Sequence, residues 1–168
     1  MPQFIITAVG PDHPGIVGEL TSYIHAGGGN ILDSRMVNLR GEFAMLILLE
    51  GGPQLGKGLA TLGETMGLRL TISETHHAQP VRGSSFRLRT YALDQPGIVA
   101  RLTKVLREFG VNIEELSARQ ESAPFDGSPL FVTEMRLTVP EGISVVKLRS
   151  ELHSVGAALN CDIDLDPA

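Results

Sequence analysis

The chain has 168 residues, of which 20% are charged, and a formal net charge of −5. Neither half is basic, which disfavours direct binding of nucleic acid because neutralising phosphates requires clustered lysines and arginines. No apolar run reaches the ~20 residues of a membrane span, and the first residues lack the basic start and apolar region of a signal peptide. The single cysteine, Cys161, has no partner for an intrachain disulfide and is expected as a buried thiol. We therefore expect a cytoplasmic protein that does not associate with membranes.

The sequence pattern of the first half of the chain predicts a first strand and two helices. A short apolar run over 4–9 stops at a Gly-Pro pair and predicts a strand. Apolar residues with helical spacing follow, and they predict a helix with Pro14 at its first position and Asp12 or His13 as its N-cap. The periodicity over 55–66 predicts a second helix despite three glycines, each of which costs roughly 1 kcal/mol relative to alanine.

Strands account for the remainder of this half. Residues 30–39 and 42–49 are extended in pattern and predict a hairpin that turns at Arg40-Gly41. Residues 68–73 alternate between apolar and polar and predict a last strand. The resulting order of elements is β-α-β-β-α-β.

The second half repeats this order after a segment without periodicity. Residues 77–84 are predicted as a linker, so that 1–76 form a first domain and 85–168 a second. The hairpin of the second domain has a longer loop, over 121–129. The predicted fold class is α+β, with two tandem ferredoxin-like βαββαβ modules and antiparallel sheets.

The two predicted sheets differ on the face that carries no helices. In the first module this face is apolar and includes Ile5, Val9 and Leu46. Antiparallel sheets with a solvated face normally alternate apolar with polar residues, so we expect the other module or a second chain to cover it. In the second module, aspartates of the last strand are expected to lie opposite Arg87 and Arg89 of the first.

A sequence repeat places the same turn residues in both modules. Asp-x-Pro-Gly-Ile-Val starts at Asp12 and again at Asp94, and Gly-x-Asn-Ile places Asn30 and Asn112 at the same offset (from 12 to 94 and from 30 to 112). A period of this size indicates duplicated small domains. The repeated residues belong to turns and helix starts, and core packing does not require them.

These residue types suit an amino-acid zwitterion. The first N–H groups of a helix lack internal partners and carry positive potential, so a carboxylate can dock there. Glycine at 15 or 97 removes a Cβ that would obstruct the approach. Asp12 or Asp94 can accept from an ammonium group, and Asn30 or Asn112 can donate and accept. The alternative is that the aspartates only cap helices and the asparagines only tolerate the turn conformation.

These motifs and the order of elements resemble those of ACT domains, the small regulatory modules of amino-acid metabolism. Two in tandem resemble the family of glycine cleavage system repressors, and the 121–131 loop is typical of that group. The resemblance covers essentially the whole chain and implies effector binding at an interface between ACT modules. By position, the implied ligand-binding residues are Asp12, Gly15, Ile16 and Asn30 in the first module and Asp94, Gly97, Ile98 and Asn112 in the second. Serine-binding ACT domains carry a histidine where this chain has Gly10 or Ala92, and an asparagine where it has Asp12 or Asp94. The resemblance therefore does not imply which amino acid is bound.

Enzymes are the main alternative of another class. Acylphosphatase shares the order of elements but holds phosphate with an arginine in the first loop, where this chain has none. A carboxylate in that loop would repel phosphate, and no nucleophile with its base is recognisable. The histidines lack metal-ligand spacing, and the few aromatic residues disfavour an RNA-recognition module. We expect no catalytic residues, no metal and no cofactor.

Two functions remain open. The favoured one is an amino-acid sensor that forms a homodimer and regulates transcription of amino-acid or glycine metabolism indirectly, through a transcription-activator partner. The other is a protein-interaction or dimerisation module without a small-molecule ligand. Ligand binding can alter contact with a partner only if its affinity differs between two states of the protein.

Overall fold

The computed structural model describes residues 2–75, 81–122 and 128–168. The chain divides into two compact units, Met1–Ala78 and Gln79–Ala168, and each is described here by itself. Residues 77–80 of the predicted linker lie outside the described residues, and the first strand of the second unit begins at Gly83.

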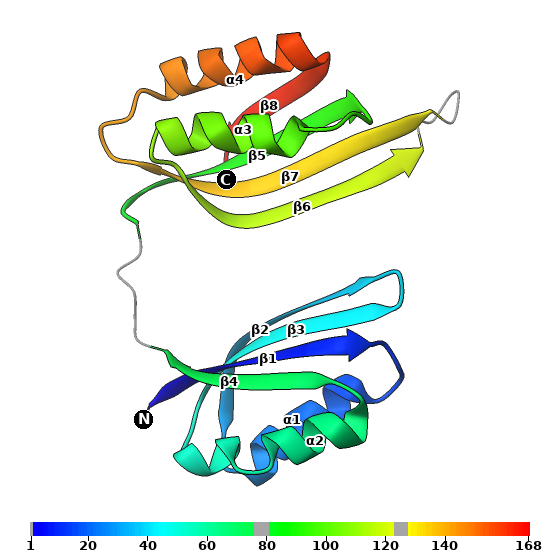
Figure 1. Ribbon diagram of the computed structural model, residues 1–168. Coiled ribbons are helices and arrows are strands. Elements are labelled where there is room, and N and C mark those ends of the chain that lie inside the picture. Colours follow the sequence, from blue (N-terminus) through cyan, green and yellow to red (C-terminus); the bar gives the residue numbers. More distant parts are fainter. Residues whose placement is uncertain (1, 76–80, 123–127) are drawn as a thin grey trace. The chain divides into compact units, whose positions relative to one another are not determined.

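The first unit has the predicted order of elements around one antiparallel sheet (Figure 1). The strands run in the spatial order β2-β3-β1-β4, so the first strand lies in the middle of the sheet. The elements are β1 (Gln3–Pro11), α1 (Ile16–Ala26), β2 (Asn30–Leu39), β3 (Glu42–Glu50), the 3₁₀ helix η1 (Pro53–Gly56), α2 (Leu59–Met66) and β4 (Arg69–Thr75).

The second unit repeats this topology, with the strand order β6-β7-β5-β8. Its elements are β5 (Gly83–Leu93), α3 (Ile98–Glu108), β6 (Asn112–Ser122), β7 (Pro129–Pro140), α4 (Val145–Leu159) and β8 (Cys161–Pro167). The two units confirm the predicted α+β fold of two ferredoxin-like modules. Of the predicted loop at 121–129, residues 123–127 lie outside the described residues.

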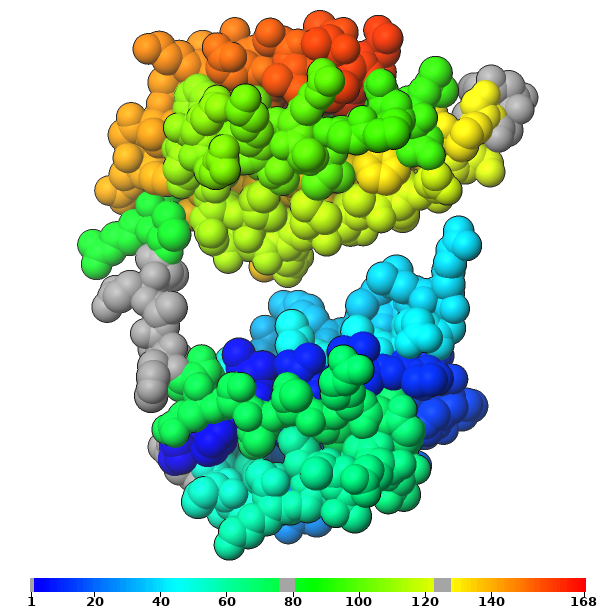
Figure 2. Space-filling model, viewed as in Figure 1, coloured from blue at the N-terminus to red at the C-terminus, as the bar shows by residue number. Residues whose placement is uncertain are grey.

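In each unit both helices cover the same face of the sheet (Figure 1). The core of each unit lies between them, where alternate strand residues meet the apolar side of the helices. Fully buried examples are Ile6, Leu20 and Ile47 in the first unit and Leu88, Leu102 and Leu152 in the second. The space-filling view shows the helices of the second unit packed directly on its sheet (Figure 2).

Two predictions for the first unit are wrong in detail. The predicted helix over 55–66 is divided, because Gly58 adopts a φ of 102° between η1 and α2. Helix α1 begins at Ile16 with Gly15 as its N-cap, so neither Asp12 nor His13 caps it. Pro14 accordingly precedes the helix. Both differences arise where a glycine adopts a positive φ, which ends or starts a helix irrespective of the apolar periodicity.

The predicted hairpin turn at Arg40-Gly41 is confirmed. Leu39 pairs with Glu42 across the turn, and both turn residues have positive φ values, 53° and 88°. These are the backbone signs of a type I′ turn, which matches the twist of the flanking strands. The tip of this hairpin protrudes from the first unit (Figure 2).

Two threonines meet in the core of the second unit. Thr90 of β5 lies opposite Thr133 of β7, both are fully buried, and neither hydroxyl has a hydrogen-bond partner in the described parts of the chain. The first unit has the apolar pair Ala8 and Met45 at the corresponding ladder position. Cys161 is also buried here, as expected, and this burial raises the pKa of its thiol.

An apolar replacement in this pair should stabilise the second unit. A buried hydroxyl without a partner costs ~1–3 kcal/mol of desolvation, so Thr133→Val is expected to raise the free energy of unfolding by about 1 kcal/mol. Urea denaturation of the full chain measures this change. Thr103→Val in α3, where the hydroxyl donates to Ala100 O at 3.2 Å, is the control and should give no gain. A loss of stability in Thr133→Val would contradict the prediction.

Candidate functional site

The turn from the first strand to the first helix has the same geometry in both units. It connects β1 to α1 through residues 12–15 and β5 to α3 through residues 94–97. Gly15 and Gly97 are the N-caps, with φ values of 101° and 91°. A side chain at either position would be strained by this φ, which explains glycine in the repeat.

Among the described residues, the space that a Cβ on either glycine would enter is open. A Cβ built on Gly97 meets no atom within 4 Å, and one on Gly15 meets only Glu19 Oε1 at 3.6 Å. Glycine is therefore required here by the backbone conformation and not by a close neighbour within the module.

The starts of α1 and α3 lack a side-chain cap. By contrast, Ser144 caps α4, where its hydroxyl accepts from Lys147 N at 3.3 Å. The first N–H groups of a helix have no partner within the helix, so those of α1 and α3 remain available for an anion. Ile16 and Ile98 follow the glycines with 2% and 1% of their surface exposed. Their side chains fix the helix in the core, and only their backbone faces the turn.

The two aspartates are each held by an amide side chain. Asn38 Nδ2 donates to Asp12 Oδ2 at 2.5 Å, and Gln120 Nε2 donates to Asp94 Oδ2 at 2.6 Å. The two amides recur at the same offset as the aspartates (from 12 to 94 and from 38 to 120). Sequence reasoning missed them because asparagine and glutamine differ in identity, although the shared offset of two amide residues is a signal that can be read from the sequence.

The site loop of the first unit is further attached to the β2–β3 hairpin. Asp12 N donates to Gly41 O at 2.8 Å, and Gly41 N donates to Asn38 Oδ1 at 3.2 Å. Both atoms of the Asn38 amide are therefore engaged, one by the turn and one by the aspartate. In the second unit Asp94 N donates to Pro129 O at 3.3 Å, at the start of β7. This arrangement fixes the direction of each carboxylate.

The predicted asparagines do not join the aspartates of their own module. Asn30 lies opposite Glu50 at one end of β3, whereas the site loop follows Pro11, which lies opposite Glu42 at the other end. Eight residues of strand separate the two ends, which is roughly 26 Å. Asn112 is similarly remote from Asp94, since it lies opposite Thr138 and Leu93 lies opposite Leu130. The aspartate and the asparagine of one module therefore do not form a single site, because the chain order places Asn30 and Asn112 at the opposite end of the sheet.

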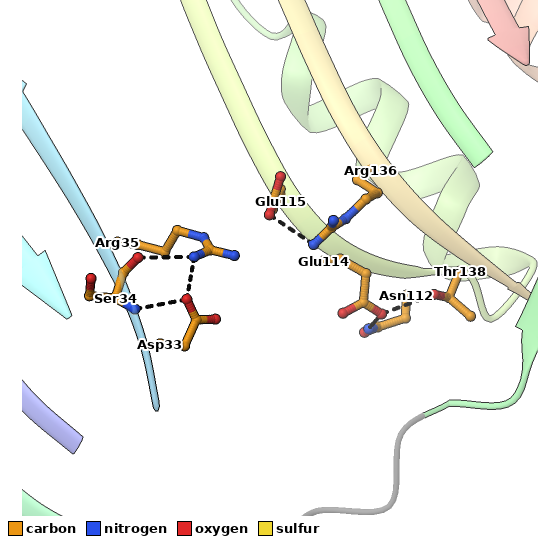
Figure 3. Close-up of polar contacts among 8 residues, drawn as sticks. All are labelled: Asp33, Ser34, Arg35, Asn112, Glu114, Glu115, Arg136 and Thr138. Carbon is orange, nitrogen blue, oxygen red and sulfur yellow. Dashed lines mark hydrogen bonds and ion pairs between the residues drawn. The ribbon is translucent and has the colours of Figure 1, made fainter. Parts of the chain in front are cut away.

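Each asparagine has a local partner at that end. Asn112 Nδ2 donates to Glu114 Oε1 at 2.5 Å, and Thr138 Oγ1 donates to the same oxygen at 3.0 Å (Figure 3). Asn30 Nδ2 donates to Glu50 Oε1 at 3.4 Å. In both units the asparagine is thus an exposed amide beside a glutamate.

An open pocket of about 470 Å³ lies at the turn of the second unit. This volume falls in the range of small-molecule sites, ~300–1,000 Å³. The pocket is lined by Asp94, Gln95, Pro96, Gly97, Ile98, Val99, Ala100 and Phe131. It therefore combines the aspartate, the uncapped helix start and an aromatic side chain.

The residue after each aspartate attaches the turn to the end of the second helix. His13 Nε2 lies 3.0 Å from Met66 O, the last residue of α2. Gln95 Nε2 donates to Leu159 O, the last residue of α4. Terminal carbonyls of a helix lack partners within it, so both side chains satisfy such a carbonyl and hold the turn in place. His13 is exposed and, instead of capping α1, has this structural role.

The His13 ring contacts carbonyls through both nitrogens. Hydrogen bonds with Met66 O and with Pro14 O, the latter at 3.2 Å from Nδ1, raise the pKa of the imidazole. Only the imidazolium can donate through both nitrogens at once. A raised folded-state pKa stabilises the fold fully below the ordinary value of about 6.5, and the contribution is lost as the pH rises through the folded pKa.

His13→Gln should remove this pH dependence. The variant copies Gln95 of the other module, so the contact with Met66 O can be kept without a titrating group. We expect the stability of the wild type relative to His13→Gln to be greater at pH 5.5 than at pH 8.5, measured by urea denaturation at both values. His153→Gln on α4 is the control. An equal difference at both pH values would contradict the role given to the imidazolium.

Other types of site find less support. Among residues 2–75, 81–122 and 128–168, no three histidines, cysteines or acids are arranged to hold a metal ion. No helix in these parts of the chain is long and apolar enough to cross a membrane.

Comparison with known proteins agrees with this fold. A model of the ACT domain matches residues 2–73, and the second unit repeats the same topology. These features define a tandem ACT-domain regulatory protein.

Related proteins specify the group. The glycine cleavage system transcriptional repressor of Escherichia coli strain K12 is 31% identical over 161 residues, which cover 93% of this chain and 85% of that protein. The chain therefore belongs to the ACT-domain family of regulators related to this repressor.

Two solved structures have the same fold over nearly the full chain. A protein of unknown function from Galdieria sulphuraria is 27% identical, with a TM-score of 0.85 and coverage of 99% of this chain and 98% of that one. A protein provisionally named a glycine cleavage system transcriptional repressor is 25% identical, with a TM-score of 0.72 and coverage of 98% and 96%.

Proposed function

We propose that this regulator binds an amino acid at the turn before α1 or α3. The observation that carries the proposal is an aspartate held by an amide donor next to an uncapped helix start, present in both modules. The helix start supplies N–H groups and positive potential for a carboxylate, and the aspartate supplies an acceptor for an ammonium group. An amino acid carries both groups a short distance apart.

The orientation of the aspartate supports this role. Asn38 and Gln120 each bond only one carboxylate oxygen, Oδ2. Within the described residues, the other oxygen, Oδ1, has no hydrogen-bond partner in Asp12 or Asp94. Since an ionised carboxylate can accept several hydrogen bonds, Oδ1 is available to a ligand while Oδ2 fixes the side chain.

Asn30 and Asn112 cannot contribute to the proposed site of their own module. Because each lies at the far end of its own sheet, neither can reach the turn of its own module. Their exposed amides can serve a ligand only from another copy of the module, such as one in a second chain. The aspartate and the helix start form the part of the site that needs no such contribution.

Control of transcription would be indirect in this proposal. The chain carries a net charge of −5, which opposes contact with DNA phosphates. The relative in Escherichia coli bears the name of a repressor and not of an enzyme. We therefore propose that ligand binding shifts the protein between states that differ in affinity for a transcription-activator partner, with amino-acid or glycine metabolism as the regulated process.

Removing the aspartate charge should weaken ligand binding. Calorimetric titration of the full chain with each of the twenty standard amino acids identifies the ligand. Asp94→Asn and Asp12→Asn are then expected to lower affinity about 10- to 100-fold, because a hydrogen bond to a charged group contributes ~1.5–3 kcal/mol. Asp162→Asn, an exposed aspartate on β8, is the control. Heat signals from none of the twenty would favour the interaction module without a ligand.

Replacing the amide donors should have a similar effect for a different reason. Asn38→Asp and Gln120→Glu keep the shape of the side chain but place a second negative charge beside the site aspartate. We expect the affinity for the same amino acid to fall about tenfold, with circular dichroism unchanged, because the carboxylate loses the donor that orients it. Val146→Glu also adds a negative charge, at an exposed position near the start of α4, and should leave affinity unaltered. Full affinity in both variants would remove the positioning role.

A further inference from the structure

The helix-free face of the first sheet has an apolar surface. Residues opposite one another in the ladder share a face, and on this face Ile5 lies opposite Leu48, Thr7 opposite Leu46, and Val9 opposite Ala44. The exposed fractions of Leu46 and Val9 are 52% and 42%. Val37 and Leu39 extend the same face along β2, with 45% and 67% exposed. We call this the open face of the first unit.

The second unit has charged residues at two of the three corresponding ladder positions, and Tyr91 lies opposite Val132 at the third. Arg87 lies opposite Arg136, and Arg89 lies opposite Glu134. On β8 the aspartates expected from the sequence complete this face, with Asp166 opposite Arg87 and Asp164 opposite Arg89. The same sheet topology therefore carries a mainly charged face in one unit and a mainly apolar one in the other.

This difference has an energetic consequence. This fold accepts charged residues on its open face, as the second unit shows, and such residues suit contact with water. Retaining leucine, isoleucine and valine at exposed positions leaves apolar surface in water, at a cost of ~25 cal/mol per Å². Contiguous apolar patches of this kind mark interaction surfaces.

We infer that the open face of the first unit packs against the same face of a second copy of this chain. Four strands about 4.8 Å apart and roughly 30 Å long offer on the order of 600 Å² per copy, or about 1,200 Å² in total. This is at the lower end of stable, specific protein interfaces. Two sheet faces commonly pack on each other with strands inclined by about 30°.

The residues of the face are compatible with a twofold pairing. Two shallow hollows of about 200 and 110 Å³ lie on it, and Leu46 borders both. A protruding side chain next to a hollow is self-complementary across a twofold axis. Toward the β2 edge the face carries both signs of charge, in the pair Arg35 and Asp33. A second copy can therefore meet opposite charges at the rim and apolar residues at the centre.

A charged partner surface fits this face less well. Covering Leu46 and Leu48 with a surface like the open face of the second unit would desolvate arginines and acids against aliphatic groups, which is costly unless each charge remains paired. The inference does not depend on the proposed amino-acid ligand, because none of these residues belongs to the turn before α1.

The test uses the second unit as a guide to substitutions that the fold accepts. Leu46→Glu copies Glu134, and Leu48→Arg copies Arg136, at corresponding ladder positions. Sedimentation velocity of the full chain over a range of concentrations gives the oligomeric state. Circular dichroism confirms that each variant is folded. Val146→Glu is the matched control, since Val146 on α4 is 79% exposed and lies away from the face.

We expect a dimeric wild type, a dimeric Val146→Glu and a monomeric Leu46→Glu/Leu48→Arg double variant, with the dimer weakened at least 100-fold. The melting temperature of the wild type should also rise with protein concentration. A wild type that is monomeric at every concentration would overturn the inference. That result is expected if the open face is covered within a single chain. A folded double variant that dimerises like the wild type would also overturn it, because the dimer would then use another surface. If the double variant fails to fold, the single variant Leu46→Glu decides between the same outcomes.

Discussion

The conformation of one glycine at the start of the first helix determines how each module can bind a ligand. With a positive φ, Gly15 or Gly97 turns the chain from the central strand into the helix without a side-chain cap. The aspartate then lies outside the helix, held by an amide of the edge strand β2 or β6. Had the aspartate capped the helix, its carboxylate would have satisfied the same N–H groups that are now available. The candidate site thus depends on a backbone conformation more than on any single side chain.

Several contacts keep this turn in position. A side chain after the aspartate reaches the last carbonyl of the second helix, through histidine in one module and an amide in the other. In the first module the hairpin turn at Gly41 bonds both the backbone of Asp12 and the side chain of Asn38. The turn is therefore tied to two different elements, which gives a small module a preorganised loop.

Duplication has left the two modules alike in fold and different in surface. Both have the strand order that places the first strand at the centre and the helices on one face. Because the other face carries no helices, its residues are free to diverge without disturbing the core. They are mainly charged in the second module and mainly apolar in the first. The surface available for association is therefore concentrated on one module, while the turn geometry is preserved in both.

The sequence by itself determined the elements and their order, because apolar periodicity, the Arg40-Gly41 turn and the internal repeat are local signals. It also identified the aspartates and glycines of the turn, since they recur at one offset. It did not identify the division between η1 and α2 or the true cap of α1, because a positive φ at glycine depends on the packing on either side. Only the tertiary structure showed that Asn30 is remote from Asp12 and that Asn38 contacts Asp12. The reason is that strand register decides which residues at distant sequence positions share one end of a sheet.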